Sequence, residues 1–148
     1  MKELLNKQAK LSPNFTLGEL TKTRHVTPDG NIPSGVVVET LKRLCPWLEE
    51  LRLRCKAPIV INSGYRSPAV NKLAGGAANS NHLSGCAVDI RCAGKEQMIR
   101  YAAILLDIAD GTKQDYDELL LEQHGSVCWL HFAVRPQGNR RRVGFLKA

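Results

Sequence analysis

The chain has 148 residues, of which 43% are hydrophobic and 24% charged, and its formal net charge is +7 at pH 7. This length is typical of one domain, and the composition excludes disordered and fibrous proteins. No apolar run approaches the ~20 residues that a membrane-spanning helix needs. Charged and amide side chains interrupt the segment 1–7, so no signal peptide is visible and we expect synthesis in the cytoplasm.

The cysteines are scattered and form no C-x-x-C pair: Cys45, Cys55, Cys86, Cys92 and Cys128. This pattern disfavours a disulfide scaffold and a cysteine-based zinc site. We therefore expect buried thiols in a reducing compartment.

The excess of basic residues, 21 Lys and Arg against 14 Asp and Glu, favours an anionic partner. Charge alone leaves nucleic acid, an anionic membrane, a cell-wall polymer and a merely solvated basic surface all open. The basic segment Asn139–Arg142 has no interleaved aromatic residues, so nucleic-acid binding is not expected. We predict that this segment is a solvated terminus or contacts the anionic cell wall.

Hydrophobic periodicity and turn residues predict the secondary structure in chain order. The elements are a short helix at 16–20, a long helix at 36–55, strands at 58–63 and 86–91, a helix at 95–109, and strands at 118–123 and 127–134. Thr16 and Glu19 have the spacing of a helix-capping box, and Pro46 is expected to kink the long helix or divide it in two. The Gly- and Asn-rich stretch Asn71–Ser84 is predicted to be an irregular surface segment. Helices followed by mostly antiparallel strands predict a single α+β domain with a small antiparallel sheet flanked by helices.

Three potential metal ligands stand out, namely His82, Asp89 and His131. Two imidazoles and one carboxylate with an open fourth position are what a hydrolytic Zn²⁺ site requires. Spacing alone is weak support, because a histidine in a strand beside aromatic residues is often only a half-buried structural residue. The best physical indication is Asp89, which lies in the apolar run Ala87–Ile90, where a buried carboxylate is costly unless it is paired or metal-bound.

Several motifs in order resemble the M15 zinc peptidases, the group of D-alanyl-D-alanine carboxypeptidases and phage endolysins, and within it the subfamily A branch. Ser80–Asp89 matches the S-x-H-x-x-G-x-A-x-D motif of that family. Ser63–Pro68 looks like its S-G-Y-R-S segment, and Trp129–His131 looks like its W-x-H strand. Asn14–Leu17 is similar to the N-terminal start of one branch. The resemblance covers about residues 13–146, nearly the whole chain.

This resemblance implies a hedgehog/DD-peptidase type of fold, with an N-terminal arm over residues 1–12 and the peptidase domain over residues 13–148. It implies Zn²⁺ held by His82, Asp89 and His131. Arg66 is implied to stabilise the oxyanion or grip a substrate carboxylate, and its structural alternative is a pair with Asp89 or the C-terminal region. The residues expected to bind substrate or to orient the ligands are Ser80, Tyr65 and Trp129.

The general base is where the resemblance loosens. Many members carry an acidic residue three positions before the last histidine, where this chain has Cys128. Asp117–Glu122 instead resembles a D-x-L-I-x-E strand found in one branch. The sequence therefore offers Glu122 as the predicted base, with Glu118 as the alternative on the same face.

The length of the turn between the last two predicted strands determines whether Glu122 can act as the general base. If Gly125-Ser126 forms a two-residue turn, Glu122 lies opposite Trp129 and shares a sheet face with His131. A three-residue turn would send Glu122 to the other face.

The expected function is therefore zinc-dependent hydrolysis of peptidoglycan stem peptides, of the D-Ala-D-Ala carboxypeptidase or L-Ala-D-Glu endopeptidase type. We expect a monomer of the phage or prophage lysin kind, which acts on the bacterial cell wall once it is released. The alternative is a catalytically inactive module that binds cell-wall peptide on the same fold, and Cys128 is the residue that favours it.

Overall fold

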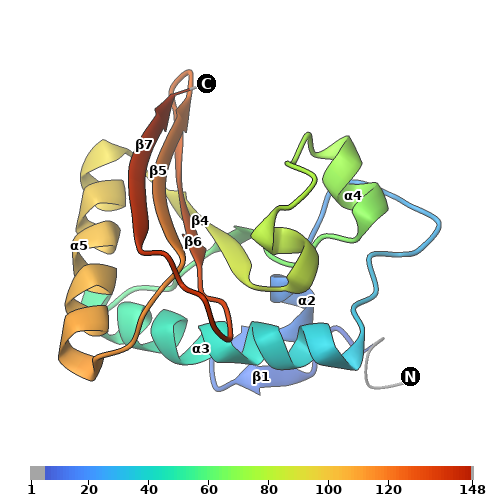
Figure 1. Cartoon of the computed structure of the whole chain (residues 1–148), viewed down its shortest axis with the longest axis horizontal. Helices are drawn as coiled ribbons and strands as arrows, with labels where there is room; N and C mark the ends of the chain where they lie inside the picture. Colours follow the sequence, from blue (N-terminus) through green and yellow to red (C-terminus); the bar gives the residue numbers. More distant parts are fainter. Residues whose placement is uncertain (1–5, 148) are drawn as a thin grey trace.

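The computed structural model describes residues 6–147, which form a single α+β domain (Figure 1). The fold class predicted from the sequence is thus confirmed. Residues 1–5, on which much of the expected arm and the signal-peptide interpretation fall, lie outside the described residues. No helix in the described part of the chain is long and apolar enough to cross a membrane.

The helices are α2 (Leu17–Leu20), α3 (Gly35–Cys55), α4 (Pro68–Leu73), the 3₁₀ helix η1 (Asn81–Ser84) and α5 (Lys95–Thr112). The strands are β1 (Lys10–Ser12), β2 (Phe15–Thr16), β3 (Ile61–Ser63), β4 (Ala87–Cys92), β5 (Glu118–His124), β6 (Val127–Ala133) and β7 (Arg142–Lys147).

The five-stranded sheet has the order β3-β4-β6-β5-β7, and β1 and β2 form a separate two-stranded ribbon. Neighbouring strands of the larger sheet are antiparallel except β7, which runs parallel to β5. Arg140, Arg141 and Arg142 are exposed, as predicted, but they do not form a free terminus, because Arg142 begins β7 and Arg140 pairs with Asp117. A contact of this segment with the cell wall stays a prediction. Five of the six residues of β7 are exposed, so its sequence carries no alternation that would predict a strand.

The predicted helices form, with caps that explain where they begin. Thr16 and Glu19 make both hydrogen bonds of the capping box at α2. Ser34 caps α3, which runs as one helix through Pro46, so a division into two helices is wrong. Helix α4 is not predicted, although the N-cap Ser67 followed by a proline is a helix-start signal.

The predicted irregular stretch Asn71–Ser84 is only partly irregular. Helix α4 extends to Leu73, and η1 occupies the last four residues. Asn81 and His82 in η1 are buried. A one-turn helix with a single apolar residue, Leu83, has no hydrophobic period, which is why the sequence does not reveal it.

The β5–β6 hairpin has the register that a two-residue Gly125-Ser126 turn predicts. Glu122 pairs with Trp129, and Leu120 pairs with His131. Gly125 has a φ of 60°, a left-handed conformation that favours glycine.

One face of the sheet packs against the hydrophobic core, and the other faces η1 and α4. On one face Leu130 and Phe132 of β6 are fully buried beneath α3 and α5, and the ring of Phe132 lies 5.2 Å from that of Trp47. Figure 1 shows α5 on this side of the sheet, with η1 and α4 on the other. Trp129 and His131 alternate with the core residues and therefore face the side of η1.

Candidate metal centre

A cavity of about 560 Å³ lies between the sheet and the segment that contains α4 and η1. Seven of the eight site residues predicted from the sequence line it: Arg66, Ser80, His82, Asp89, Glu122, Trp129 and His131. Tyr65 is instead packed in the hydrophobic core and is not among the residues that line this cavity. A role for Tyr65 in substrate binding therefore stays a prediction without a contact to support it.

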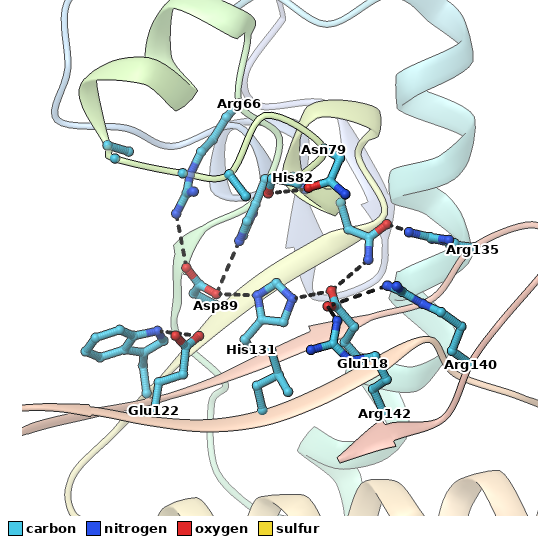
Figure 2. Close-up of a pocket in the computed structure, with 18 residues that line it drawn as sticks. Arg66, Asn79, His82, Asp89, Glu118, Glu122, His131, Arg135, Arg140 and Arg142 are labelled. Carbon is cyan, nitrogen blue, oxygen red and sulfur yellow. Dashed lines mark hydrogen bonds and ion pairs between the residues drawn. The ribbon is translucent and has the colours of Figure 1, made fainter. Parts of the chain in front are cut away.

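The centre of the cavity is the carboxylate of Asp89 on β4, flanked by two imidazoles (Figure 2). Asp89 Oδ1 lies 3.3 Å from Nε2 of His82 and 3.1 Å from Nδ1 of His131. The three side chains are almost completely buried. His131 is the cross-strand partner of Asp89 in the β4–β6 ladder, whereas His82 reaches the same point from η1.

Local structure sets the orientation of His82. The hydroxyl of Ser80 caps η1 by accepting from the His82 backbone N–H, and Gly85 ends it at a φ of 72°. Nδ1 of His82 donates to the Gly64 carbonyl over 2.7 Å, which directs Nε2 toward Asp89. A side chain at Gly64 would meet the Leu20 carbonyl oxygen at 2.2 Å, so only glycine allows this close approach.

These three side chains fit a zinc ion. One nitrogen of His82, one of His131 and one oxygen of Asp89 lie within 4.8 Å of one another. Tetrahedral zinc with bonds of about 2.0–2.1 Å separates neighbouring ligand atoms by about 3.3–3.4 Å, close to the 3.1 and 3.3 Å seen here. Two imidazoles and one carboxylate also leave the fourth position that a hydrolytic site needs.

The second nitrogen of His131 is held by Glu118. Nε2 donates to Glu118 Oε1 over 2.9 Å, which directs Nδ1 toward Asp89. Asn81 also donates to Oε1, and Arg142 donates to Oε2. Glu118 was the alternative base in the sequence analysis, but both of its oxygens are engaged with protein groups.

Neighbouring charges and hydrogen bonds shift the pKa values of the buried titratable groups in the centre. Burial alone would raise the pKa of Asp89, but the charges and hydrogen bonds of His82 and His131 outweigh it and lower that pKa. Burial alone would lower the pKa of His131, yet hydrogen bonds to Asp89 and Glu118 raise it to about 9. The hydrogen bond from His131 lowers the pKa of Glu118 to about 2 against the effect of burial.

Arg66 lies beside the centre on the side of α4. Its Nη2 is 3.3 Å from Asp89 Oδ2, and its Nε donates to the Ser63 hydroxyl over 3.0 Å. The pair with Asp89 that the sequence analysis weighed as a structural alternative is therefore present. Arg66 also lines the cavity, so the ion pair with Asp89 is compatible with a contact between Arg66 and substrate.

Glu122 lines the cavity from β5, and Figure 2 shows it below Asp89. The indole N–H of Trp129 donates to Glu122 Oε2 over 3.1 Å. Burial raises the pKa of Glu122, and the charge of Asp89 adds to this effect. Cys128, by contrast, belongs to the hydrophobic core on the opposite face of the sheet.

Several cavity residues escaped the sequence analysis, and they come from segments far apart in the chain. Asn81 donates to both Asp117 and Glu118, and Arg135 donates to Asn81 Oδ1 over 2.9 Å. Arg140 binds Asp117 through Nε and Nη2. The run of arginines near the C-terminus was visible in the sequence, but its acidic partners were not.

Residues 13–116, more than two thirds of the chain, match the family model described as Peptidase M15. The match includes Arg66, His82 and Asp89 and ends before β5 and β6. No curated protein gives a significant match. On the length of the family match, the chain belongs to the peptidase M15 family.

Proposed function

We propose that this M15 peptidase is a zinc-dependent enzyme that hydrolyses amide bonds in peptidoglycan stem peptides. The observation that carries the proposal is the buried carboxylate of Asp89 between nitrogens of His82 and His131, inside a cavity that also contains Glu122. The bond cut is of the D-Ala-D-Ala carboxypeptidase or the L-Ala-D-Glu endopeptidase type.

Five of the cavity residues have a part in this hydrolysis: His82, Asp89, His131, Glu122 and Arg66. Zinc held by the three ligands would supply Lewis acidity toward water and the scissile carbonyl. Glu122 accepts a proton from the attacking water while the oxygen of that water bonds to the carbonyl carbon. Arg66 donates to the carbonyl oxygen as negative charge develops there. The C–N bond then breaks, and Glu122 passes its proton to the leaving amine.

Two features support Glu122 as the base. It shares a sheet face with His131 as a diagonal neighbour, at a backbone separation of roughly 7–8 Å that a glutamate side chain can span toward a water at the centre. Its raised pKa is the direction that a general base requires near neutral pH. Cys128, the residue that favoured an inactive module, faces the core and takes no part in the cavity.

The test compares wild type with Glu122→Gln and His131→Ala. Zinc is measured by elemental analysis, and cleavage is measured as new amino termini released from purified peptidoglycan. We expect Glu122→Gln to keep its zinc and lose at least about 100-fold in cleavage rate, the usual worth of a general base. His131→Ala should lose the zinc. Glu39→Gln, at an exposed position on α3, is the control with the same chemical change.

The outcomes separate the alternatives. Stoichiometric zinc in the wild type without any released amino termini supports the inactive binding module. Unchanged cleavage in Glu122→Gln removes Glu122 from the mechanism. Absence of zinc after reconstitution contradicts the assignment of the three ligands.

A further inference from the structure

Arg135 lies at the junction of two adjoining cavities. It follows β6 and lines both the cavity of the metal centre and a neighbouring cavity of about 450 Å³. In Figure 2, Arg66 and Arg135 lie on opposite sides of the group formed by His82, Asp89 and His131. A peptide bound across the centre therefore meets a guanidinium group on each side.

The position of Arg135 is fixed at both its backbone and its side chain. The amide of Asn139 accepts from the Arg135 backbone N–H over 2.8 Å and donates to its carbonyl over 2.9 Å. The side chain donates through Nε to Asn81 Oδ1, and the same Nε lies 3.2 Å from Asp117 Oδ2. The guanidinium group is therefore already oriented before any ligand binds.

The outer edge of this guanidinium group remains available. Within residues 6–147, no hydrogen bond or ion pair involves Nη1 or Nη2 of Arg135, whose side chain is 33% exposed. Arg140, by comparison, donates hydrogen bonds to Asp117 through Nε and Nη2, and Arg142 donates one to Glu118 through Nη1. Three arginines thus pair with two carboxylates, and of the three only Arg135 has both terminal nitrogens without a partner among the described residues.

We propose that Arg135 forms a carboxylate-binding subsite beside the metal centre. A planar guanidinium group with two unused nitrogens matches a carboxylate in a two-pronged hydrogen-bonded pair. The adjoining cavity has Val36, Val37 and Pro136 in its wall, which suits the aliphatic part of the residue that carries the carboxylate. The inference rests on the proposed function, since it assumes a peptide held at the metal centre.

The ligand is a peptide with a free carboxylate on the Arg135 side of the scissile bond. In a stem pentapeptide, L-Ala-γ-D-Glu-L-Lys-D-Ala-D-Ala, that group is either the carboxyl terminus or the α-carboxylate of D-Glu. The first source corresponds to removal of a terminal residue, and the second corresponds to cleavage within the stem.

The experiment measures binding of three peptides by calorimetry to the non-cleaving Glu122→Gln protein, with its zinc content recorded. The peptides are the stem pentapeptide, its C-terminal amide and its D-isoglutamine form. We expect one of the two amidations to weaken binding at least about tenfold, because it removes a charge-assisted pair. The same amidation should have no effect in the double variant Glu122→Gln/Arg135→Gln.

Two further variants make the result interpretable. Arg135→Lys keeps the charge without the two-pronged geometry, so it should also lose most of the discrimination, and it serves if Arg135→Gln folds poorly. Arg141→Gln is the matched control, since Arg141 pairs with Asp115 and does not line either cavity.

The inference is overturned if amidation weakens binding equally with and without Arg135, or if no peptide binds. Failure of the proposed function is a separate result, because it appears as absent cleavage by wild type whereas this measurement compares affinities in a protein that does not cleave.

Discussion

The His131 imidazole uses both of its nitrogens. Nδ1 faces Asp89 at 3.1 Å, and Nε2 donates to Glu118 at 2.9 Å. A histidine ligand held in this way by a carboxylate has its tautomer and ring orientation set in advance, which raises its basicity toward a metal. In the proposed mechanism Glu118 is therefore a positioning residue that acts through His131, and Glu122 is the residue that transfers the proton.

Removing Glu118 should weaken metal binding. We expect Glu118→Ala to lower zinc affinity about 10- to 100-fold, the usual cost of losing such a partner. Glu118→Gln keeps an acceptor for Nε2 of His131, so its zinc affinity should fall less than that of Glu118→Ala. Competition with a chromophoric chelator measures both affinities, with Glu96→Ala, at an exposed position of α5, as the control. Equal affinity in wild type and Glu118→Ala would show that the ring needs no such support.

Among the elements, the edge strand β7 is tied to β5 by Asp117, the residue directly before β5. The Asp117 side chain is fully buried and accepts from the backbone N–H and the guanidinium group of Arg140. It also accepts from Asn81 of η1. One carboxylate thus joins the segment before β7 to β5 and to the helical turn that carries His82.

The contribution of Asp117 to stability should depend on pH. Burial alone would raise the pKa of Asp117, but hydrogen bonds from Arg140 and Asn81 lower it from 3.8 to about 2. A depressed folded-state pKa stabilises the protein above pH ~4, and this contribution is lost as the pH falls through about 2. At about 1.4 kcal/mol per pKa unit, the contribution is about 2 kcal/mol.

Urea unfolding of wild type and Asp117→Asn between pH 2 and 6 tests this. The difference in the free energy of unfolding should be largest above pH ~4 and shrink toward pH ~2. A difference that does not change with pH would mean that the charge of Asp117 contributes nothing to stability.

Across the molecule as a whole, the three candidate ligands come from separate elements. His82 lies in η1, Asp89 in β4 and His131 in β6, while α3 and α5 pack against the other face of the sheet. A metal bound there would join the loop layer to the sheet. Binding that requires the folded arrangement must also stabilise that arrangement.

Metal removal should therefore lower the melting temperature. Free zinc at 100 times its Kd stabilises a fold by about 2.7 kcal/mol, which is a rise in Tm of roughly 5–10 °C for a chain of this length. Calorimetric scans with and without a chelator should differ by about this amount in wild type and not in His131→Ala. An equal response of both proteins to the chelator would place the stabilising metal elsewhere.

Features that depend on local pattern could be predicted from the amino-acid sequence. The long helices follow from apolar residues three and four apart, and the capping box at Thr16 follows from its spacing to Glu19. For the hairpin, the sequence offered a two-residue or a three-residue turn at Gly125-Ser126, and the structure has the two-residue turn that puts Glu122 and His131 on one face. The motif spacing singled out the three side chains that the fold brings together.

Contacts between side chains that are far apart in the sequence could not be predicted and are seen only in the folded chain. Arg135 binds Asn81 across 54 residues of sequence, and Asn81 binds Asp117 across 36. β7 pairs with β5 although its own residues are mostly exposed, and the burial of Tyr65 removed it from the cavity. Periodicity reports which face of one element is buried, but it carries no information about the partner. Ion pairs and edge-strand pairing depend on that partner, so they become visible only once the chain is folded.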